Sequence, residues 1–303
     1  MNITLFGGTG FVGSHLARSL THRGHNLTLF TRRPTPDSSD YEQITGQLDD
    51  INKIDLALNR ADVLIYCIGI IRAFSRRGIT FERAHVSLLA DILARAAVKN
   101  VRHVILISAW GIDRARTPYQ RTKLEGESIL KSYDIPWTIL RPSLIFGPAN
   151  GRKELTMTLA RQMIKPRIPV PLFFSGWQIT RAGQFRLSPV HVSDVAELVG
   201  HVIDRLEEFS RQTLPVGGPD SLTWREMVTR IAAACGRKKW FVPVPVALLF
   251  PVLALLDRFA WFPITRDQLT MLVAGNDCAE EKPWTEWGIN PKRFTASQLS
   301  WLK

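Results

Sequence analysis

The sequence contains few cysteines, and those present are far apart. Cys67, Cys235 and Cys278 are the only three among 303 residues, and they show no paired spacing. This pattern argues against a disulfide framework and a structural zinc site, and it is typical of a reducing compartment. We therefore expect no metal centre. The N-terminus also lacks the basic, apolar and small-residue order of a signal peptide, so we expect a cytoplasmic protein.

Acidic residues are scarce relative to basic ones. The chain has 27 Asp and Glu against 39 Lys and Arg, a formal charge of +12. Such an excess favours an anionic partner, namely a phosphorylated cofactor, an acidic protein surface or an anionic membrane, although a solvated basic surface explains it equally well. No basic stripe alternates with stacking aromatic residues, so we expect no nucleic-acid partner.

No apolar run is long enough to predict a transmembrane helix. The longest, Trp240–Leu256, has seventeen uncharged residues, the lower limit for a span, and three prolines interrupt it. We expect a hydrophobic helical lid within Trp240–Phe262. Two interpretations stay open. Trp240, Trp261 and Phe262 suit peripheral contact with the inner face of a membrane, whereas a helix over a substrate pocket or at a dimer interface has the same composition.

Short apolar runs alternate with helical patterns over the first half of the chain. We therefore predict an α/β fold, a Rossmann-type doubly wound parallel sheet, with a dinucleotide-binding domain over residues 1–150. After Pro148 the rhythm changes, and residues 151–303 are expected to form a smaller substrate-side C-terminal lobe, interleaved with the first domain. The predicted strands are Asn2–Phe6, Asn26–Thr31, Val63–Cys67, His103–Ser108 and Trp137–Leu140, and the predicted helices are Phe11–Arg23, Phe81–Lys99 and Tyr119–Ser132.

A glycine-rich loop joins the first predicted strand to the first predicted helix. Its glycines permit a tight turn and a close approach to phosphate, and the helix N-terminus offers unpaired N–H groups to a pyrophosphate. The strand before the loop and the helix after it make the pattern specific for a dinucleotide. The predicted contacts come from Gly7, Thr9, Gly10, Phe11, Val12 and Gly13.

Two arginines follow the second predicted strand. An acid at this place would bind the ribose hydroxyls of NAD, but the residues are Arg32 and Arg33. Their charge and planar donors suit the 2′-phosphate of NADP, so we expect NADP(H) to be preferred over NAD(H). A pair of solvent-facing arginines is the alternative. Further along, Leu48 and Asp49 are expected beside the adenine, and the segment Cys67, Ile68 and Gly69 near the ribose.

Four motifs make the chain resemble the extended and atypical short-chain dehydrogenase/reductases, which include epimerase/dehydratase-like members. They are the glycine loop, Tyr119-Gln-Arg-Thr-Lys123, Arg141-Pro142-Ser143 and Pro189-Val-His-Val-Ser-Asp-Val-Ala196. Within that family the chain is similar to the NADPH-binding accessory subunit of respiratory complex I and its bacterial relatives. The resemblance implies that Tyr119 is a general acid or base, that Lys123 lowers its proton affinity, and that Ser108, Tyr119, Lys123, Pro142 and Ser143 contact the cofactor.

The site departs from the family pattern in one respect. Active members usually place a substrate-binding hydroxyl one or two residues after the first serine that follows the fifth strand, and here Ala109 and Trp110 follow Ser108. Ser108 is therefore a doubtful catalytic residue. The first interpretation is an NADP(H)-binding accessory or assembly factor in respiratory-chain or quinone metabolism. The alternative is an active NADP-dependent reductase or dehydrogenase on a hydrophobic carbonyl or hydroxyl compound.

Two histidines invite a catalytic role. His85 lies on the face of a predicted helix, where we expect a packing or helix-contact residue. His191 lies in a short predicted strand before a helix that Ser193 or Asp194 would cap, and we expect a structural role there as well.

Overall fold

The computed structural model describes residues 1–35, 40–75, 78–256, 264–278 and 284–303. Contacts divide the chain into two compact units. Unit 1 comprises residues 1–142, 192–215 and 286–289, and unit 2 comprises residues 143–191, 216–285 and 290–303. The chain passes between the units more than once, and residues 192–215 pack with the N-terminal half of the sequence.

A seven-stranded sheet forms the centre of unit 1, in the order β11-β6-β5-β4-β1-β2-β3. The five neighbouring pairs from β3 to β6 are all parallel. The Rossmann-type parallel α/β fold predicted from the sequence is therefore confirmed. The strands are β1 (Asn2–Phe6), β2 (Asn26–Thr31), β3 (Glu42–Thr45), β4 (Val63–Tyr66), β5 (His103–Ile107), β6 (Trp137–Pro142) and β11 (Gln212–Val216).

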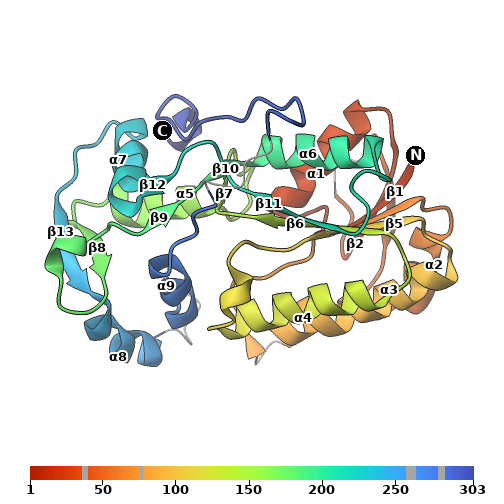
Figure 1. The fold of residues 1–303 in the computed structure, drawn as a ribbon, viewed down its shortest axis with the longest axis horizontal. Coiled ribbons are helices and arrows are strands. Elements are labelled where there is room, and N and C mark those ends of the chain that lie inside the picture. The colour runs from red at the N-terminus through yellow and green to blue at the C-terminus, as the bar shows by residue number, and fades with distance from the viewer. Residues whose placement is uncertain (36–39, 76–77, 257–263, 279–283) are drawn as a thin grey trace. The chain divides into compact units, whose positions relative to one another are not determined.

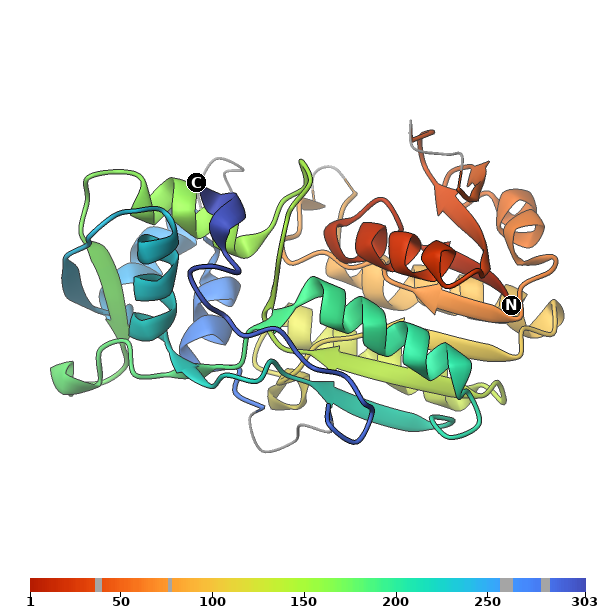
Figure 2. The same cartoon turned by 90° about the horizontal axis from the view of Figure 1, so that it is seen from above.

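Helices cover both faces of this sheet (Figure 1). Helices α1 and α6 lie side by side on one face, as the second view also shows (Figure 2). Helices α3 and α4 lie on the other face, where α2 packs against α3. The helices are α1 (Phe11–His22), α2 (Ile51–Leu58), the π-helical turn η2 (Arg83–Ser87), α3 (Leu88–Val98), the 3₁₀ turn η3 (Ile112–Arg114), α4 (Pro118–Ser132) and α6 (Val192–Asp204).

Local sequence explains where these elements begin. The central strands β4 and β5 have no exposed residue, because both sheet faces are covered and apolar runs such as Val63–Tyr66 can be buried completely. Helix α4 starts at a capping box between Thr117 and Gln120, with Pro118 in the first helical position. The strand order reverses between β1 and β4, which opens a crevice at their carboxyl ends.

Unit 2 surrounds a second core that contains Phe146, Leu172, Trp224, Met227 and Phe294. The indole Nε1 of Trp224 donates to the carbonyl oxygen of Pro171 at 2.9 Å, so this buried ring keeps a polar partner. The elements are β7 (Ile145–Phe146), α5 (Leu155–Leu159), the π-helical turn η4 (Ala160–Ile164), β8 (Val170–Phe174), η5 (Ile179–Arg181), β9 (Arg186–Leu187), β10 (Val190–His191), β12 (Leu222–Thr223), α7 (Trp224–Ala234), β13 (Phe241–Pro245), α8 (Val246–Leu256), α9 (Arg266–Val273) and η6 (Ser300–Leu302).

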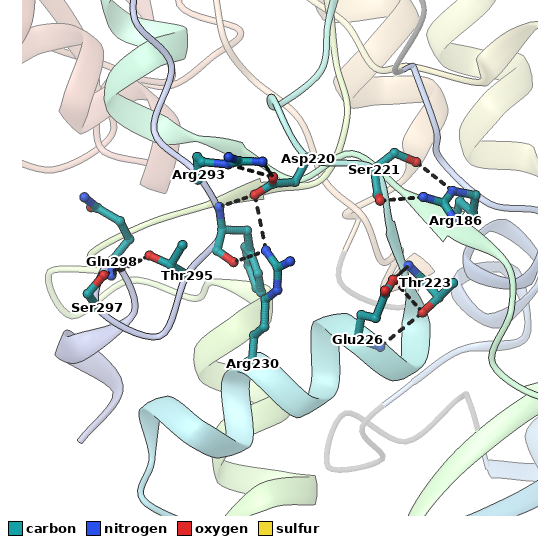
Figure 3. A network of polar contacts seen from close by, with 11 residues as sticks. Arg186, Asp220, Ser221, Thr223, Glu226, Arg230, Arg293, Thr295, Ser297 and Gln298 are labelled. Atoms are coloured by element: carbon teal, nitrogen blue, oxygen red, sulfur yellow. Dashed lines mark hydrogen bonds and ion pairs between the residues drawn. The ribbon is translucent and has the colours of Figure 1, made fainter.

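A buried carboxylate holds the C-terminal segment of unit 2 (Figure 3). Asp220 Oδ1 accepts from Arg293 Nε at 2.9 Å and Nη2 at 2.7 Å, and Oδ2 accepts from the Phe294 amide at 3.0 Å. Arg230 Nη1 lies 3.3 Å from Oδ2 and donates to the Phe294 carbonyl oxygen at 2.8 Å. Because Asp220 is buried, these contacts replace the water that its charge has lost.

The apolar stretch after Trp240 is not one helix. Phe241–Pro245 forms strand β13, which pairs in parallel with β8, and only Val246–Leu256 is helical. A helix therefore lies within the stretch, as expected, but it does not include the first part, since Pro243 and Pro245 cannot continue a helix and the alternating valines suit a strand. Trp261 and Phe262 lie outside the described residues. Within the described ranges, no helix has the length and apolarity needed to cross a bilayer.

Candidate functional site

The glycine loop brings the ends of β1 and β4 into close contact. A Cβ at Gly7 would lie 2.7 Å from the Cys67 carbonyl carbon, and Gly7 has a positive φ of 90°. A Cβ at Gly13 would lie 2.2 Å from the Gly7 carbonyl oxygen. Both positions therefore require glycine. Gly10 is the N-cap of helix α1 and has no side chain to cap it, so the amides of Phe11, Val12 and Gly13 have no intrahelical partner.

The end of β2 combines a buried hydroxyl with two exposed cations. Thr31 is buried, and its Oγ1 has no hydrogen-bond partner among the described residues. Arg32 and Arg33 follow it and are exposed. An unpaired buried hydroxyl normally has a bound water or ligand as its partner. The adjacent guanidinium groups present donors that suit a phosphate.

The segment that leaves β4 lies beside the lysine predicted to be catalytic. Gly69 is exposed, and a Cβ there would lie 3.5 Å from Lys123 Nζ. Cys67 and Ile68 are partly buried, and burial raises the pKa of the Cys67 thiol to about 12. Leu48 packs at the edge of the unit 1 core. Asp49 is exposed, and its carboxylate lies 3.7 Å from Arg83, a weak surface pair.

Lys123 is buried beneath this segment. Its Nζ donates to the Ile107 carbonyl oxygen at 3.0 Å, at the end of β5. Burial lowers the pKa of the Lys123 amine to about 8, while the nearby Cys67 and Glu127 act in the opposite direction. The amine is therefore still mostly protonated at neutral pH, and it can place a positive charge at the carboxyl ends of β4 and β5.

Tyr119 lies one helical turn before Lys123 on the same face of α4. The phenol is partly buried, and its ring makes edge contacts with Phe81 and His85 at centroid distances of 5.8 and 5.4 Å. Burial raises the pKa of Tyr119 to about 12. The phenol therefore stays protonated at neutral pH and can donate its proton.

Ser108 has its hydroxyl occupied within the protein. Its Oγ donates to Glu127 Oε1 at 2.5 Å, and the same carboxylate accepts from Arg141 Nε at 2.9 Å and Nη2 at 2.6 Å. Glu127 is almost completely buried, at 1% exposure. Ala109 and Trp110, the next two positions, have no hydroxyl. The structure thus gives Ser108 an acceptor on helix α4.

The remaining two predicted cofactor residues lie at the end of β6. Pro142 is buried, and its carbonyl oxygen accepts from the Trp110 amide at 2.9 Å. Ser143 begins the first segment of unit 2, where its Oγ donates to the Asn276 carbonyl oxygen at 2.9 Å and its amide donates to Val216. The Ser143 side chain therefore has a partner within its own unit.

The residues of unit 1 fit a nicotinamide dinucleotide. Cβ atoms at Gly7 and Gly13 would clash with the backbone of this turn, and the first amides of α1, which have no intrahelical partner, suit a pyrophosphate. The Thr31 hydroxyl, which has no hydrogen-bond partner in the described part of the chain, lies at the strand end where an adenosine ribose is held in this fold. Among the described residues, no group of three or more His, Cys, Asp or Glu side chains could hold a metal ion.

His85 also belongs to this site, although its sequence position predicted only a packing or helix-contact role. It is buried as predicted for a packing residue, but its ring also contacts Tyr119. Burial, together with the charge of Lys123, lowers its pKa to about 3. A single histidine in an amphipathic helix gives no periodic signal, so only the contact with another helix identifies it.

Comparison with known proteins identifies a family and several relatives of this chain. The model of the NAD dependent epimerase/dehydratase family matches residues 3–217. A ceramide reductase of Caulobacter vibrioides is 28% identical over 94% of this chain and 85% of its own. The mitochondrial NADH-ubiquinone oxidoreductase 40 kDa subunit of Neurospora crassa is 24% identical over 86% of this chain and 67% of its own.

A similar fold occurs in a solved structure of UDP-glucuronic acid 4-epimerase from Bacillus cereus, in complex with UDP-glucuronic acid and NAD. Its TM-score is 0.73 at 16% identity, over 99% of this chain and 96% of the other. At that identity the likeness extends to the fold alone. The family match covers more than two thirds of the chain and includes the glycine loop, Tyr119 and Lys123. The chain therefore belongs to the NAD dependent epimerase/dehydratase family.

Proposed function

We propose that this protein is an NADP(H)-dependent reductase that acts on the carbonyl group of a hydrophobic, lipid-like compound. The placement of Tyr119 and Lys123 carries the proposal. Both lie on one face of α4, with the Lys123 amine 3.0 Å from the end of β5 and close to Gly69 after β4. In a parallel α/β sheet this edge is where ligands bind.

Tyr119 is the proton donor in this proposal. Reduction of a carbonyl needs a proton at the substrate oxygen, and the raised pKa of Tyr119 keeps the phenol protonated until that oxygen becomes basic. A bound reduced nicotinamide supplies the hydride. Lys123 would bind the ribose hydroxyls of the cofactor, and its positive charge would stabilise negative charge that develops on the Tyr119 oxygen.

The preference for NADP(H) rests on Arg32 and Arg33. Both side chains are exposed directly after β2, and the position that would carry a ribose-binding acid is occupied by arginine. A bidentate contact with a 2′-phosphate is charge-assisted, so we expect NADPH to bind at least about tenfold more tightly than NADH, equivalent to about 1.4 kcal/mol.

The hydrophobic character of the substrate is inferred from an apolar surface in unit 2. Leu248, Val252 and Leu255 of helix α8 are 69%, 46% and 58% exposed, while Leu253 on the same helix is buried in the core. Trp240, just before β13, is 82% exposed, and Lys238 beside it is exposed as well. Exposed apolar side chains on one helix suit the surface of a membrane, where a lipid substrate would be found, and the exposed indole and cation before β13 suit its headgroup region. Similarity to a ceramide reductase supports the same substrate class.

An accessory role in respiratory or quinone metabolism is the second candidate. It is favoured by Ser108, whose hydroxyl is bound to Glu127, and by Ala109 and Trp110, which leave no substrate-binding hydroxyl at the usual positions. Similarity to a respiratory-complex subunit supports it as well. In that case the protein would bind the dinucleotide without turnover. The exposed apolar side chains of α8, Leu248, Val252 and Leu255, would then bind a protein or membrane partner.

Cofactor oxidation separates the two candidates. The purified protein would be mixed with NADPH and long-chain ketones in detergent micelles, and absorbance at 340 nm would be followed. We expect turnover, and we expect Tyr119→Phe to lower kcat by roughly 10²–10⁴-fold while NADPH affinity is unchanged. Tyr133→Phe, at the other end of α4, is the matched control. A protein that binds NADPH but does not oxidise it in the presence of any of the ketones would favour the accessory role.

Calorimetric titration tests the cofactor preference. Arg32→Ala should remove most of the advantage of NADPH and leave NADH affinity nearly unchanged. Equal affinities for NADPH and NADH in the unmodified protein would refute the proposed preference.

Sedimentation with vesicles tests the membrane contact. The protein should sediment with phosphatidylglycerol-containing vesicles, and less so as salt rises, because only the charge component is screened. Replacing Leu248, Val252 and Leu255 by serine should release it. Ile51→Ser with Leu56→Ser removes two comparably exposed apolar side chains of unit 1 and serves as control. Vesicle binding that survives the triple substitution would contradict the assignment of this surface.

A further inference from the structure

His85 lies between helix α4 and the segment that follows β4. It lies in the π-helical turn η2 and is 2% exposed. Its ring stacks on Phe81 at a centroid distance of 5.8 Å and meets the edge of Tyr119 at 5.4 Å. One imidazole thus contacts the proposed proton donor directly.

The two ring nitrogens have different partners. Nε2 accepts a hydrogen bond from the Ile70 amide at 3.3 Å, so Nε2 carries no proton. Nδ1 lies 3.0 Å from Thr122 Oγ1. Thr122 Oγ1 is also within hydrogen-bond distance of the Pro118 carbonyl oxygen, at 3.0 Å, to which only the hydroxyl can donate. The Thr122 oxygen therefore accepts from Nδ1, and this network assigns the neutral Nδ1–H tautomer.

The backbone around His85 is fixed as well. A Cβ at Gly126 would lie 2.4 Å from the His85 carbonyl oxygen, so α4 approaches the π-helical turn as closely as glycine allows. The Tyr66 hydroxyl donates to the carbonyl oxygen of the preceding residue, Ala84, at 2.7 Å. Single π-helical turns are frequent at functional sites, where they redirect one side chain. Here the turn directs His85 toward Tyr119.

We propose that His85 is a positioning residue that joins the Gly69–Ile70 segment to Tyr119 through its neutral Nδ1–H ring. The inference rests on the proposed function, since it assumes that this segment holds the nicotinamide half of the cofactor. The ring contacts both sides. On the loop it accepts from the Ile70 amide, and on α4 it donates to Thr122 and meets the edge of the Tyr119 ring. The hydrogen bond that Nε2 accepts from Ile70 fixes the position of the Gly69–Ile70 segment relative to the Tyr119 phenol. The neutral ring also adds no second cation beside Lys123.

Nuclear magnetic resonance tests the assigned tautomer without any ligand. Long-range ¹H–¹⁵N spectra of the histidine-labelled protein should show Nδ1 protonated and Nε2 unprotonated for His85 between pH 6 and pH 8. An Nε2–H tautomer, or an imidazolium in that range, would overturn the proposal.

Binding of a whole dinucleotide and of a fragment tests the positioning role. His85→Phe keeps a ring against Tyr119 and Phe81 but cannot accept from Ile70. We expect it to weaken NADPH binding about fivefold, the equivalent of one neutral hydrogen bond at about 1 kcal/mol, and to leave 2′,5′-ADP binding unchanged. His85→Gln, which restores an acceptor, should recover most of the NADPH affinity.

His103→Phe is the matched control for stability. His103 is equally buried and bonds to Thr138 on β6, away from Tyr119, so its loss should lower the unfolding temperature and leave both affinities unchanged. Equal NADPH affinity in the His85→Phe variant and the unmodified protein would overturn the positioning role. If the unmodified protein bound neither 2′,5′-ADP nor NADPH, the proposed function would fail. The tautomer measurement would still decide the geometry of His85.

Discussion

Replacement of Glu127 by alanine should destabilise unit 1 strongly. The carboxylate is 1% exposed and accepts three hydrogen bonds, one from Ser108 and two from Arg141. Its removal would leave the Ser108 hydroxyl without its acceptor and the Arg141 guanidinium, 13% exposed, with Asp113 alone. Because breaking a buried ion pair costs about 3–5 kcal/mol, we expect the free energy of unfolding to fall by that amount.

Two further variants test whether the charge or the shape matters. Glu127→Gln keeps the volume and one acceptor, so it should lose roughly half as much, given about 1.5–3 kcal/mol for a hydrogen bond to a charged group. Glu127→Leu combined with Arg141→Met removes both charges together and should be less harmful than Glu127→Ala, because no buried charge is left unpaired.

Urea denaturation followed by circular dichroism gives the free energies. Because the chain has two units, coincident transitions by a second probe must first establish two-state behaviour. A loss below about 1 kcal/mol for Glu127→Ala would refute the reasoning, since that is the range of exposed pairs. A double variant less stable than the single one would also contradict it.

Three further predictions concern the loop, the C-terminal segment and pH. Gly13→Ala should abolish NADPH binding, because its Cβ would lie 2.2 Å from the Gly7 carbonyl oxygen, whereas Gly10→Ala, at 3.2 Å, should weaken binding only modestly in the same titration. Asp220→Ala should lower the free energy of unfolding by about 1–3 kcal/mol, since the buried Phe294 amide loses its acceptor, while Arg293→Ala should cost less because that side chain is 71% exposed. The pKa values of His85 and His103 are lowered by burial to about 3 and about 4, so stability is fully present above pH 6.5 and falls as the pH drops toward those values. Free energies of unfolding from urea denaturation should fall by about 2 kcal/mol per histidine between pH 7 and pH 5. A free energy that does not change over this range would contradict the prediction.

The central strands of unit 1 could be predicted because they are buried on both faces. Runs such as Val63–Tyr66 and His103–Ile107 contain almost no polar residue, and their predicted bounds differ from the observed ones by a single residue. Strand β3, Glu42–Thr45, was not predicted. It lies at the sheet edge with Ile44 as its one buried residue, so it has no apolar run.

Helix boundaries were predicted well where a side chain caps them. The helix predicted over Tyr119–Ser132 is α4, which begins one residue earlier, at Pro118, behind a capping box between Thr117 and Gln120. The cap expected from Ser193 or Asp194 is wrong in position, because α6 already begins at Val192 and both residues lie in its first turn. There β10 runs directly into the helix, so no loop residue is left to serve as a separate cap.

Pairing between distant charges could not be predicted, and this limit affects the interpretation of Ser108. From the sequence, Ser108 is a serine after a strand and Glu127 is one of several charges on α4. Neither has a period or spacing that relates it to Arg141, because side chains pair across helices and strands only after the sheet has formed. The sequence could say that Ala109 and Trp110 lack a hydroxyl. Only the structure shows that the remaining hydroxyl, on Ser108, points to Glu127 at 2.5 Å. That acceptor is a buried carboxylate paired with Arg141. If the Ser108 hydroxyl turned away, the Glu127 carboxylate would lose one of its hydrogen bonds. Tyr119 is therefore left as the proton donor of the proposed reaction.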